Sequence, residues 1–209
     1  MYVHVPPEEI EPRSLAIIDA EVPEPRPFAG AEWAVARRMV HTTADFDLLN
    51  HIRFHPDAVR AGMDALRAGA DIVTDTRMAL SGIPARRLTP LGCAARCLMD
   101  EPRVAARAKA EGVTRAWAAV DEVMDGGGAD IFVIGNAPTA LYRLLERVSQ
   151  AARPPKLIVG MPVGIVNAAA SKELLLAQDA IPYIAVAGRK GGSSLAASVV
   201  NALLILAAG

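Results

Sequence analysis

The segment DIFVIGNAPTAL, residues 130–141, decides the fold class. Residues 131–134 form a continuous apolar run without polar alternation, which is typical of a strand covered by helices on both faces of its sheet. A short turn follows at 135–137, and the pattern after it predicts a helix over residues 138–150. The segment therefore predicts a buried strand, a turn and a crossover helix, which is the repeating unit of a doubly wound sheet.

The same unit recurs on both sides of this segment. Short apolar runs predict four further strands, and the residues between them have helical spacing. Five strands joined by right-handed crossovers give a three-layer, doubly wound α/β fold with a five-stranded parallel sheet, in a single domain over residues 1–209. The other predicted strands are 71–75, 94–99, 157–159 and 183–187, and the other predicted helices are 31–42, 56–68, 102–124, 167–178 and 193–206.

The first 27 residues differ from the rest in composition. They contain six of the fifteen prolines, in two clusters around a helical pattern at 12–21, and we expect a Pro-rich N-terminal arm, residues 1–27, that packs on the body. The start, MYVHVPPEEIEPRS, lacks the basic and apolar regions of a secretory signal. The apolar end, residues 193–209, is too short to span a bilayer and contains Ser198 and Asn201. These features predict a cytoplasmic protein without a membrane partner.

Composition excludes several classes of protein. A chain with 52% hydrophobic and 22% charged residues is globular, and a net charge of −1 gives no electrostatic reason to expect a nucleic-acid partner. Arginine accounts for 18 of the 22 basic residues, which suits carboxylate or phosphate binding and equally suits an ordinary solvated surface. Cys93 and Cys97 are expected as a buried, reduced pair on one face of a strand. No second ligand pair accompanies them, so no metal site is predicted.

Three of the predicted turns that follow strands are rich in glycine. They read GNAPT at 135–139, GMPVG at 160–164 and GRKGGSS at 188–194. Ligands of doubly wound sheets bind at the carboxyl ends of the strands, where glycine permits close approach and helix N-termini offer N–H groups to anions. We expect an anionic ligand, either phosphorylated or carrying several carboxylates, although such turns also use glycine for geometry alone. Neither GxGxxG nor GxxxxGK[ST] occurs, which argues against a dinucleotide or P-loop nucleotide.

One histidine is a candidate acid or base. His41 ends the predicted helix 31–42, one turn after Arg37 and Arg38. Neighbouring cations lower the pKa of an imidazole and a helix C-terminus raises it, so we expect His41 to exchange a proton near neutral pH. A packing role is the alternative for a lone histidine on a helix. His4 and His55 are expected to be structural or solvated.

Four longer motifs resemble the precorrin-8X methylmutase family, also called precorrin isomerase. They are MVHTTADFD at 39–47, IGNAPTAL at 134–141, GMPVGIVNAAASKELL at 160–175 and GRKGGSSLAASVVNAL at 188–203. The resemblance spans the whole chain. Members of the family move a methyl group from C-11 to C-12 of a contracted tetrapyrrole, precorrin-8X or cobalt-precorrin-8, giving hydrogenobyrinate or cobyrinate in cobalamin biosynthesis. They require no external cofactor.

The resemblance also implies an architecture and a set of site residues. It implies a flavodoxin-like sheet and a homodimer whose active site lies near the subunit boundary. His41 would be the proton donor and acceptor, and Ser14, Arg38 and Arg115 would bind substrate. The acetate and propionate arms of the macrocycle give the turns and their cations a role, so the further expected contacts are Gly135, Asn136, Gly160, Gly188, Arg189 and Lys190.

One segment departs from the family pattern. Residues 74–88 have Ile83, Pro84 and Ala85 after a glycine, where some relatives carry Val-Thr-Arg, so no substrate contact is assigned there. The string HTTADFD is more similar to the cobalt branch of the pathway, and the sequence leaves open whether the substrate carries cobalt. Two other functions stay open: a non-catalytic carrier of corrinoid intermediates, and an unrelated domain that binds a phosphorylated metabolite.

Overall fold

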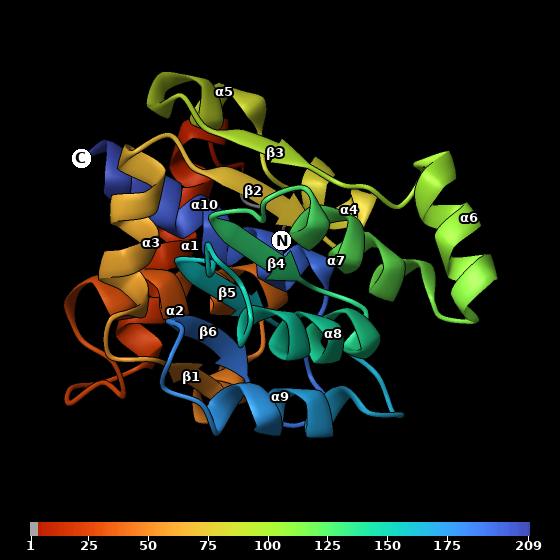
Figure 1. Ribbon diagram of the computed structural model, residues 1–209. Helices are drawn as coiled ribbons and strands as arrows, with labels where there is room; N and C mark the ends of the chain where they lie inside the picture. Colours follow the sequence, from red (N-terminus) through yellow and green to blue (C-terminus); the bar gives the residue numbers. More distant parts are fainter. Residues whose placement is uncertain (1–3) are drawn as a thin grey trace.

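A computed structural model describes residues 4–209, and residues 1–3 of the predicted arm lie outside the described part (Figure 1). Six strands form one sheet in the order β1-β6-β5-β4-β2-β3, and β2 to β6 are parallel. Counted alone, the five parallel strands follow the order 2-1-3-4-5, a common doubly wound order. The strands are β1 (Ile52–Phe54), β2 (Asp71–Thr74), β3 (Ala94–Arg96), β4 (Ile131–Ile134), β5 (Leu157–Gly160) and β6 (Tyr183–Val186).

The predicted count of five strands is wrong, because the sheet has a sixth strand at its edge. β1 pairs antiparallel with β6, with Ile52 opposite Val186 and Phe54 opposite Ile184. This strand has three residues and follows the 3₁₀ helix η1 (Phe46–Asn50) directly. A run that short has no readable alternation, so the sequence pattern could not indicate it. The five predicted parallel strands are all present, and the α/β class is confirmed.

Helices cover both faces of the sheet and give the expected three layers. Alternate residues of β4 point to opposite faces: Ile131 and Val133 belong to one core, and Phe132 and Ile134 belong to the other. The first core is covered by α1 (Pro7–Glu21), α2 (Gly30–Thr43), α3 (Ala58–Arg67) and α10 (Ser193–Ala208). The second is covered by α6 (Pro102–Glu111), α7 (Arg115–Asp125), α8 (Pro138–Val148) and α9 (Ala168–Leu176).

Several element boundaries differ from the predictions for local reasons. The arm helix α1 begins at Pro7, since proline in the first turn loses no helical hydrogen bond, and it continues through Pro12. The single helix predicted over 102–124 is two helices, because Gly112 at φ +66° ends α6 in the left-handed region. Two short helices, α4 (Arg77–Ser81) and α5 (Ala85–Leu88), occupy the segment before β3.

The cysteine prediction is partly wrong. β3 is only three residues long, so Cys93 and Cys97 lie just outside its two ends. Both are free thiols, as expected, but both are half-buried. Burial raises the pKa of the Cys93 thiol, which donates to the carbonyl oxygen of Leu66 at 3.1 Å.

Within residues 4–209, no helix combines the length and apolar character that crossing a bilayer requires.

Candidate active site

The glycine-rich turns meet at one edge of the sheet. They follow β4, β5 and β6, which are hydrogen-bonded neighbours that run parallel, so their carboxyl ends lie side by side. The strand order reverses at β2, beside β4, and ligands of doubly wound sheets bind at such switch points. This carboxyl edge is the candidate active site.

A carboxylate of the protein itself closes the turn after β4. Asp75 directly follows β2, is 5% exposed, and accepts hydrogen bonds from the N–H groups of Gly135, Asn136 and Ala137 at 2.8, 2.9 and 2.7 Å. Burial raises the pKa of Asp75, and the three N–H donors oppose that rise. These three N–H groups are therefore paired within the protein, and the exposed Asn136 side chain is the part of the turn that faces solvent.

Two of the candidate glycines have a packing role. A Cβ atom on Gly135 would lie 2.7 Å from Cα of Ser193, and a Cβ atom on Gly160 would lie 2.3 Å from Cδ2 of Leu175. These glycines let α10 and α9 approach the sheet more closely than a side chain would permit. Gly188 is different, because it is exposed and has a φ of +75°, a conformation that favours glycine.

A cluster of basic groups surrounds Glu11 of α1. Arg38 of α2, whose side chain is 14% exposed, forms an ion pair with Glu11. The hydrogen bond from Arg38 lowers the pKa of Glu11 most, burial opposes it, and the charges of Arg38, Arg87 and His41 lower it further. Burial, followed by the charge of Arg38, lowers the pKa of the Arg87 guanidinium on α5. One carboxylate does not neutralise these groups, so the cluster attracts further anions.

An ion-pair network holds the end of α2 beside the carboxyl edge. Nζ of Lys190, in the β6–α10 loop (residues 187–192), lies 2.6 Å from Oδ2 of Asp45 and 2.8 Å from Oδ2 of Asp47. These aspartates directly follow α2, which ends with Ala44 in the left-handed conformation at φ +52°. His41 lies less than one turn before that end and is half-buried. The network thus places His41 at the same edge as the glycine-rich turns.

The two cations of the β6–α10 loop have different surroundings. The ammonium of Lys190 is bound to Asp45 and Asp47, and these hydrogen bonds raise its pKa. Two of its donors are thus used within the protein, and its contact with substrate stays a prediction. The Arg189 side chain is exposed and forms no ion pair with any residue in the described range 4–209. Arg189 is therefore the cation that this loop presents to solvent.

Arg115 and Ser14 lie on opposite faces of the sheet, Arg115 at the carboxyl edge and Ser14 on α1. Arg115 is exposed at the start of α7, next to Thr114, whose Oγ1 lies 2.8 Å from Oγ1 of Thr139 at the start of α8. It therefore lies beside the turn that follows β4. Ser14 lies one turn after Glu11 on α1, and its hydroxyl donates to the carbonyl oxygen of Ile10 at 2.8 Å. Ser14 thus neighbours the basic cluster that includes Arg38.

Sequence reasoning missed four residues of this edge: Glu11, Asp75, Arg87 and Lys172. The dibasic pair before Leu88 was a visible signal for Arg87, but it lies in the segment that departs from the family pattern. Nothing in the sequence indicated that Asp75 reaches across to a turn 60 residues away. Lys172 is fully buried on α9, which the helical pattern of SKELL does not reveal.

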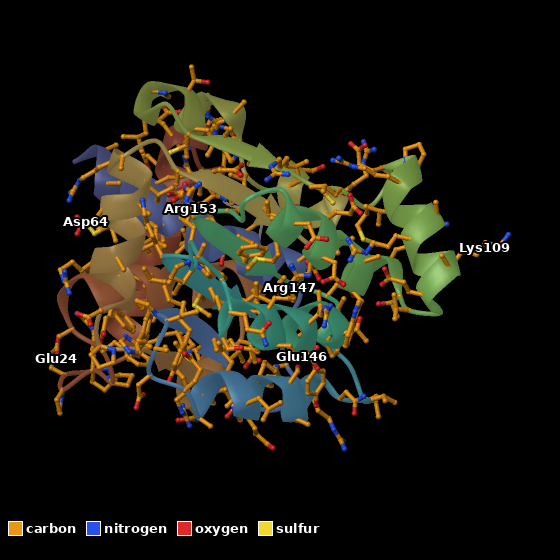
Figure 2. All side chains as sticks on the ribbon, viewed as in Figure 1. Glu24, Asp64, Lys109, Glu146, Arg147 and Arg153 are labelled. Carbon is orange, nitrogen blue, oxygen red and sulfur yellow. The ribbon has the colours of Figure 1, made fainter. Side chains whose placement is uncertain are left out.

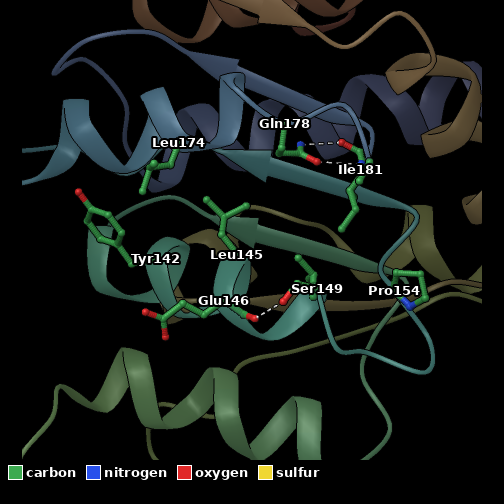
Figure 3. A pocket seen from close by; sticks show the side chains of 10 residues that line it. Tyr142, Leu145, Glu146, Ser149, Pro154, Leu174, Gln178 and Ile181 are labelled. Atoms are coloured by element: carbon green, nitrogen blue, oxygen red, sulfur yellow. Dashed lines mark hydrogen bonds between the residues drawn. The ribbon is translucent and has the colours of Figure 1, made fainter.

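The cavities of the described residues lie mostly elsewhere. A groove of about 610 Å³ runs between α8 and α9, where Tyr142, Leu145 and Leu174 line it (Figure 3). Pro154 and Ile181, which precede β5 and β6, place this groove at the amino edge of the sheet, away from His41. The cavity beside Arg38 and Glu11 has a volume of about 200 Å³. Pockets for drug-sized ligands have volumes of roughly 300–1,000 Å³, so this cavity alone is smaller than a typical ligand pocket.

The fold and the site define a class: a doubly wound α/β protein with a histidine and several arginines at or beside the carboxyl edge of its sheet. Comparison with known proteins narrows this class to one family. The sequence pattern of the precorrin-8X methylmutase family matches residues 9–206 of the chain. The chain therefore belongs to that family.

Individual relatives are similar over nearly their whole length. The chain is 46% identical over 203 residues to the cobalt-precorrin-8 methylmutase of Salmonella typhimurium, covering 95% of this chain and 94% of the relative. It is 43% identical over 204 residues to that of Leptospira interrogans, covering 94% and 92%. The solved structure of precorrin-8x methyl mutase from Thermus thermophilus is 44% identical, with a TM-score of 0.89 and 96% of each chain covered.

Proposed function

We propose that this chain acts in the cytoplasm as a homodimeric isomerase of cobalamin biosynthesis, moving a methyl group from C-11 to C-12 of precorrin-8X or cobalt-precorrin-8. The products would be hydrogenobyrinate or cobyrinate. Family membership supports the reaction, and the order of the five parallel strands supports a flavodoxin-like description of the fold. The observation that carries the proposal is the position of His41, a half-buried imidazole at the carboxyl edge that lies near Glu11 together with Arg38 and Arg87.

His41 would act as both acid and base. Protonation of a ring nitrogen draws electron density from the carbon–methyl bond that breaks and so lowers the barrier to migration. The new carbon–methyl bond forms at the adjacent ring carbon, and the proton returns to the imidazole, so the reaction is an isomerisation without net gain or loss of atoms. A general acid of this kind accelerates a reaction by about 10²–10⁴-fold, and the rest of the rate acceleration would come from holding the macrocycle in a reactive geometry.

The cations would hold the acidic arms of the macrocycle. Arg38 and Arg87 lie near Glu11 as His41 does, Arg189 is exposed on the β6–α10 loop, and Arg115 lies beside the turn after β4. Bidentate guanidinium–carboxylate contacts fix both position and orientation. Ser14 and the Asn136 side chain are proposed as further polar contacts.

A second copy of the chain would complete the site. The cavity beside Arg38 is small, and large apolar side chains are exposed on the helices around it: Ile10 and Ile17 on α1, at 51% and 57%, and Ile205 on α10, at 40%. Exposed apolar side chains of this size favour a contact between subunits. Sedimentation equilibrium should give the mass of a dimer, and Ile17→Glu should shift it toward the monomer. A wild-type chain that is monomeric and fully active would overturn this part of the proposal.

The decisive experiment separates binding from turnover. His41→Ala should bind precorrin-8X with nearly wild-type affinity, because the arginines remain, and should lose at least about 10² in rate, because no acid reaches the ring nitrogen. Single-turnover absorption changes should be followed with both metal-free and cobalt-loaded substrate, since relatives of either name are similarly identical to this chain, at 46% and 44%. A His41→Ala rate within about tenfold of wild type would refute the acid role. A wild type that binds both substrates and converts neither would favour a carrier.

A further inference from the structure

Lys172 is a buried cation in a part of the site that the proposed reaction does not use. It lies on α9, and its side chain is fully buried, at 0% exposure. Nζ donates to the carbonyl oxygen of Lys190 at 2.6 Å, in the β6–α10 loop. Burying an ammonium costs free energy, and burial lowers the pKa of Lys172 to about 8. A methionine would fill the same space without that cost, so stability alone does not explain the lysine.

The carbonyl that Lys172 holds belongs to a tightly constrained loop. The N–H of Gly192 donates to the carbonyl oxygen of Met161 at 3.0 Å, and a Cβ on Gly191 would lie 2.3 Å from that same oxygen. The loop therefore lies directly against the turn that follows β5. Lys172 contacts the loop from the first half of α9, which begins after the same turn. These contacts constrain the backbone of the loop that carries Arg189.

The same loop carries the constraint on to His41. Lys190 offers its carbonyl oxygen to Lys172 and its ammonium to Asp45 and Asp47, which follow α2. The backbone and the side chain of one residue thus join the buried ammonium to the end of the helix that holds the imidazole. Displacing the Lys190 carbonyl would move both ends of this connection.

We propose that Lys172 is a positioning residue, which fixes the β6–α10 loop so that Arg189 faces the substrate and Lys190 holds the end of α2 that carries His41. The inference rests on the proposed function of His41. It assigns Lys172 no contact with substrate and no proton transfer. Its effect reaches the reaction through two groups whose placement decides binding and rate, and misplacement by about 1 Å costs about 10²-fold in rate.

The test is Lys172→Met, which keeps the length of the side chain and removes its donors and charge. We expect kcat to fall about 10- to 100-fold, with a smaller rise in KM, while the melting temperature at pH 7 is equal to or higher than that of the wild type. Lys109→Met is the matched control, because Lys109 projects from α6 into solvent (Figure 2). The control should leave kcat, KM and melting temperature unchanged.

Lys190→Met tests the second link of the connection. It should lower kcat by a similar factor, and the double variant should be little worse than either single variant, because the two residues act in series. A Lys172→Met protein with kcat and KM within twofold of wild type would overturn the inference. A protein that fails to fold would also overturn it, because that result would make Lys172 a core residue.

His41→Ala, assayed in parallel, separates the two proposals. If His41→Ala stays active, the proposed acid fails whatever Lys172 does. If His41→Ala is inactive and Lys172→Met is normal, only the positioning role fails.

Discussion

The buried ammonium of Lys172 predicts an unusual dependence of stability on pH. The pKa of this lysine falls from 10.5 to about 8 on folding because of burial. Between these values the unfolded chain holds a proton that the native chain has released, so the free energy of unfolding rises with pH. A difference of this size corresponds to about 3 kcal/mol. Most proteins lose stability in this alkaline range, where their ion pairs lose protons.

Comparison with Lys172→Met isolates this contribution. At pH 7 the variant avoids the cost of the buried charge, about 3 kcal/mol, and loses one hydrogen bond from a charged donor, worth about 1.5–3 kcal/mol, so it should be as stable as wild type or more stable by up to about 2 kcal/mol. As pH rises from 8 to 10.5, the stability of the variant relative to wild type should fall by about 3 kcal/mol, so wild type should be the more stable protein above that range. Alkaline changes at Cys93 and Tyr183 are common to both proteins and cancel in the difference.

Urea unfolding at half-unit intervals from pH 7 to 10.5, followed by circular dichroism, measures the difference directly. Lys109→Met serves as the control for loss of a lysine, and its stability should follow the wild-type curve at every pH. A constant difference between wild type and Lys172→Met across the range would refute the reasoning, because it would mean that Lys172 keeps its ordinary pKa in the native state.

Two further substitutions test other contacts of the carboxyl edge. Glu11→Gln should lower KM several-fold, because it frees the Arg38 guanidinium for a substrate carboxylate, and an unchanged KM would show that Arg38 does not bind substrate. The variant should also lack the stability that the Glu11 carboxylate contributes above pH 4.5, which the wild type loses as pH falls through the lowered pKa of Glu11. Asp75→Asn should lower the free energy of unfolding in urea by about 1–3 kcal/mol, because the NH₂ group of asparagine would face N–H donors that now donate to the Asp75 carboxylate. An unchanged urea midpoint would show that Asp75 does not stabilise the turn.

The architecture was largely readable from the sequence because it depends on local patterns. Apolar runs such as 131–134 and the turns after them predict strand, turn and helix without knowledge of distant residues. β1 was not predicted, because a run of three residues is too short to show an alternating pattern and because its pairing with β6 joins segments about 130 residues apart. Gly112 was visible but did not by itself indicate that α6 and α7 are separate helices.

The site was only half readable, for a physical reason. The family motifs direct attention to His41, Arg38 and the glycine-rich turns, which the structure places at one edge or beside it. What surrounds each group depends on long-range contacts, and these decide which donors are free. Lys190 and Arg189 are adjacent in sequence, yet one ammonium is bound by two aspartates and one guanidinium faces solvent.

The contact between Asp75 and the turn after β4 has a consequence for inhibition. In many doubly wound proteins this position is where a phosphate from solution docks on free N–H groups. Here the anion is tethered to the chain, so it never dissociates, and a competing ion would have to displace a neighbour held at very high effective concentration. We therefore expect inorganic phosphate and nucleotides to leave this turn unoccupied.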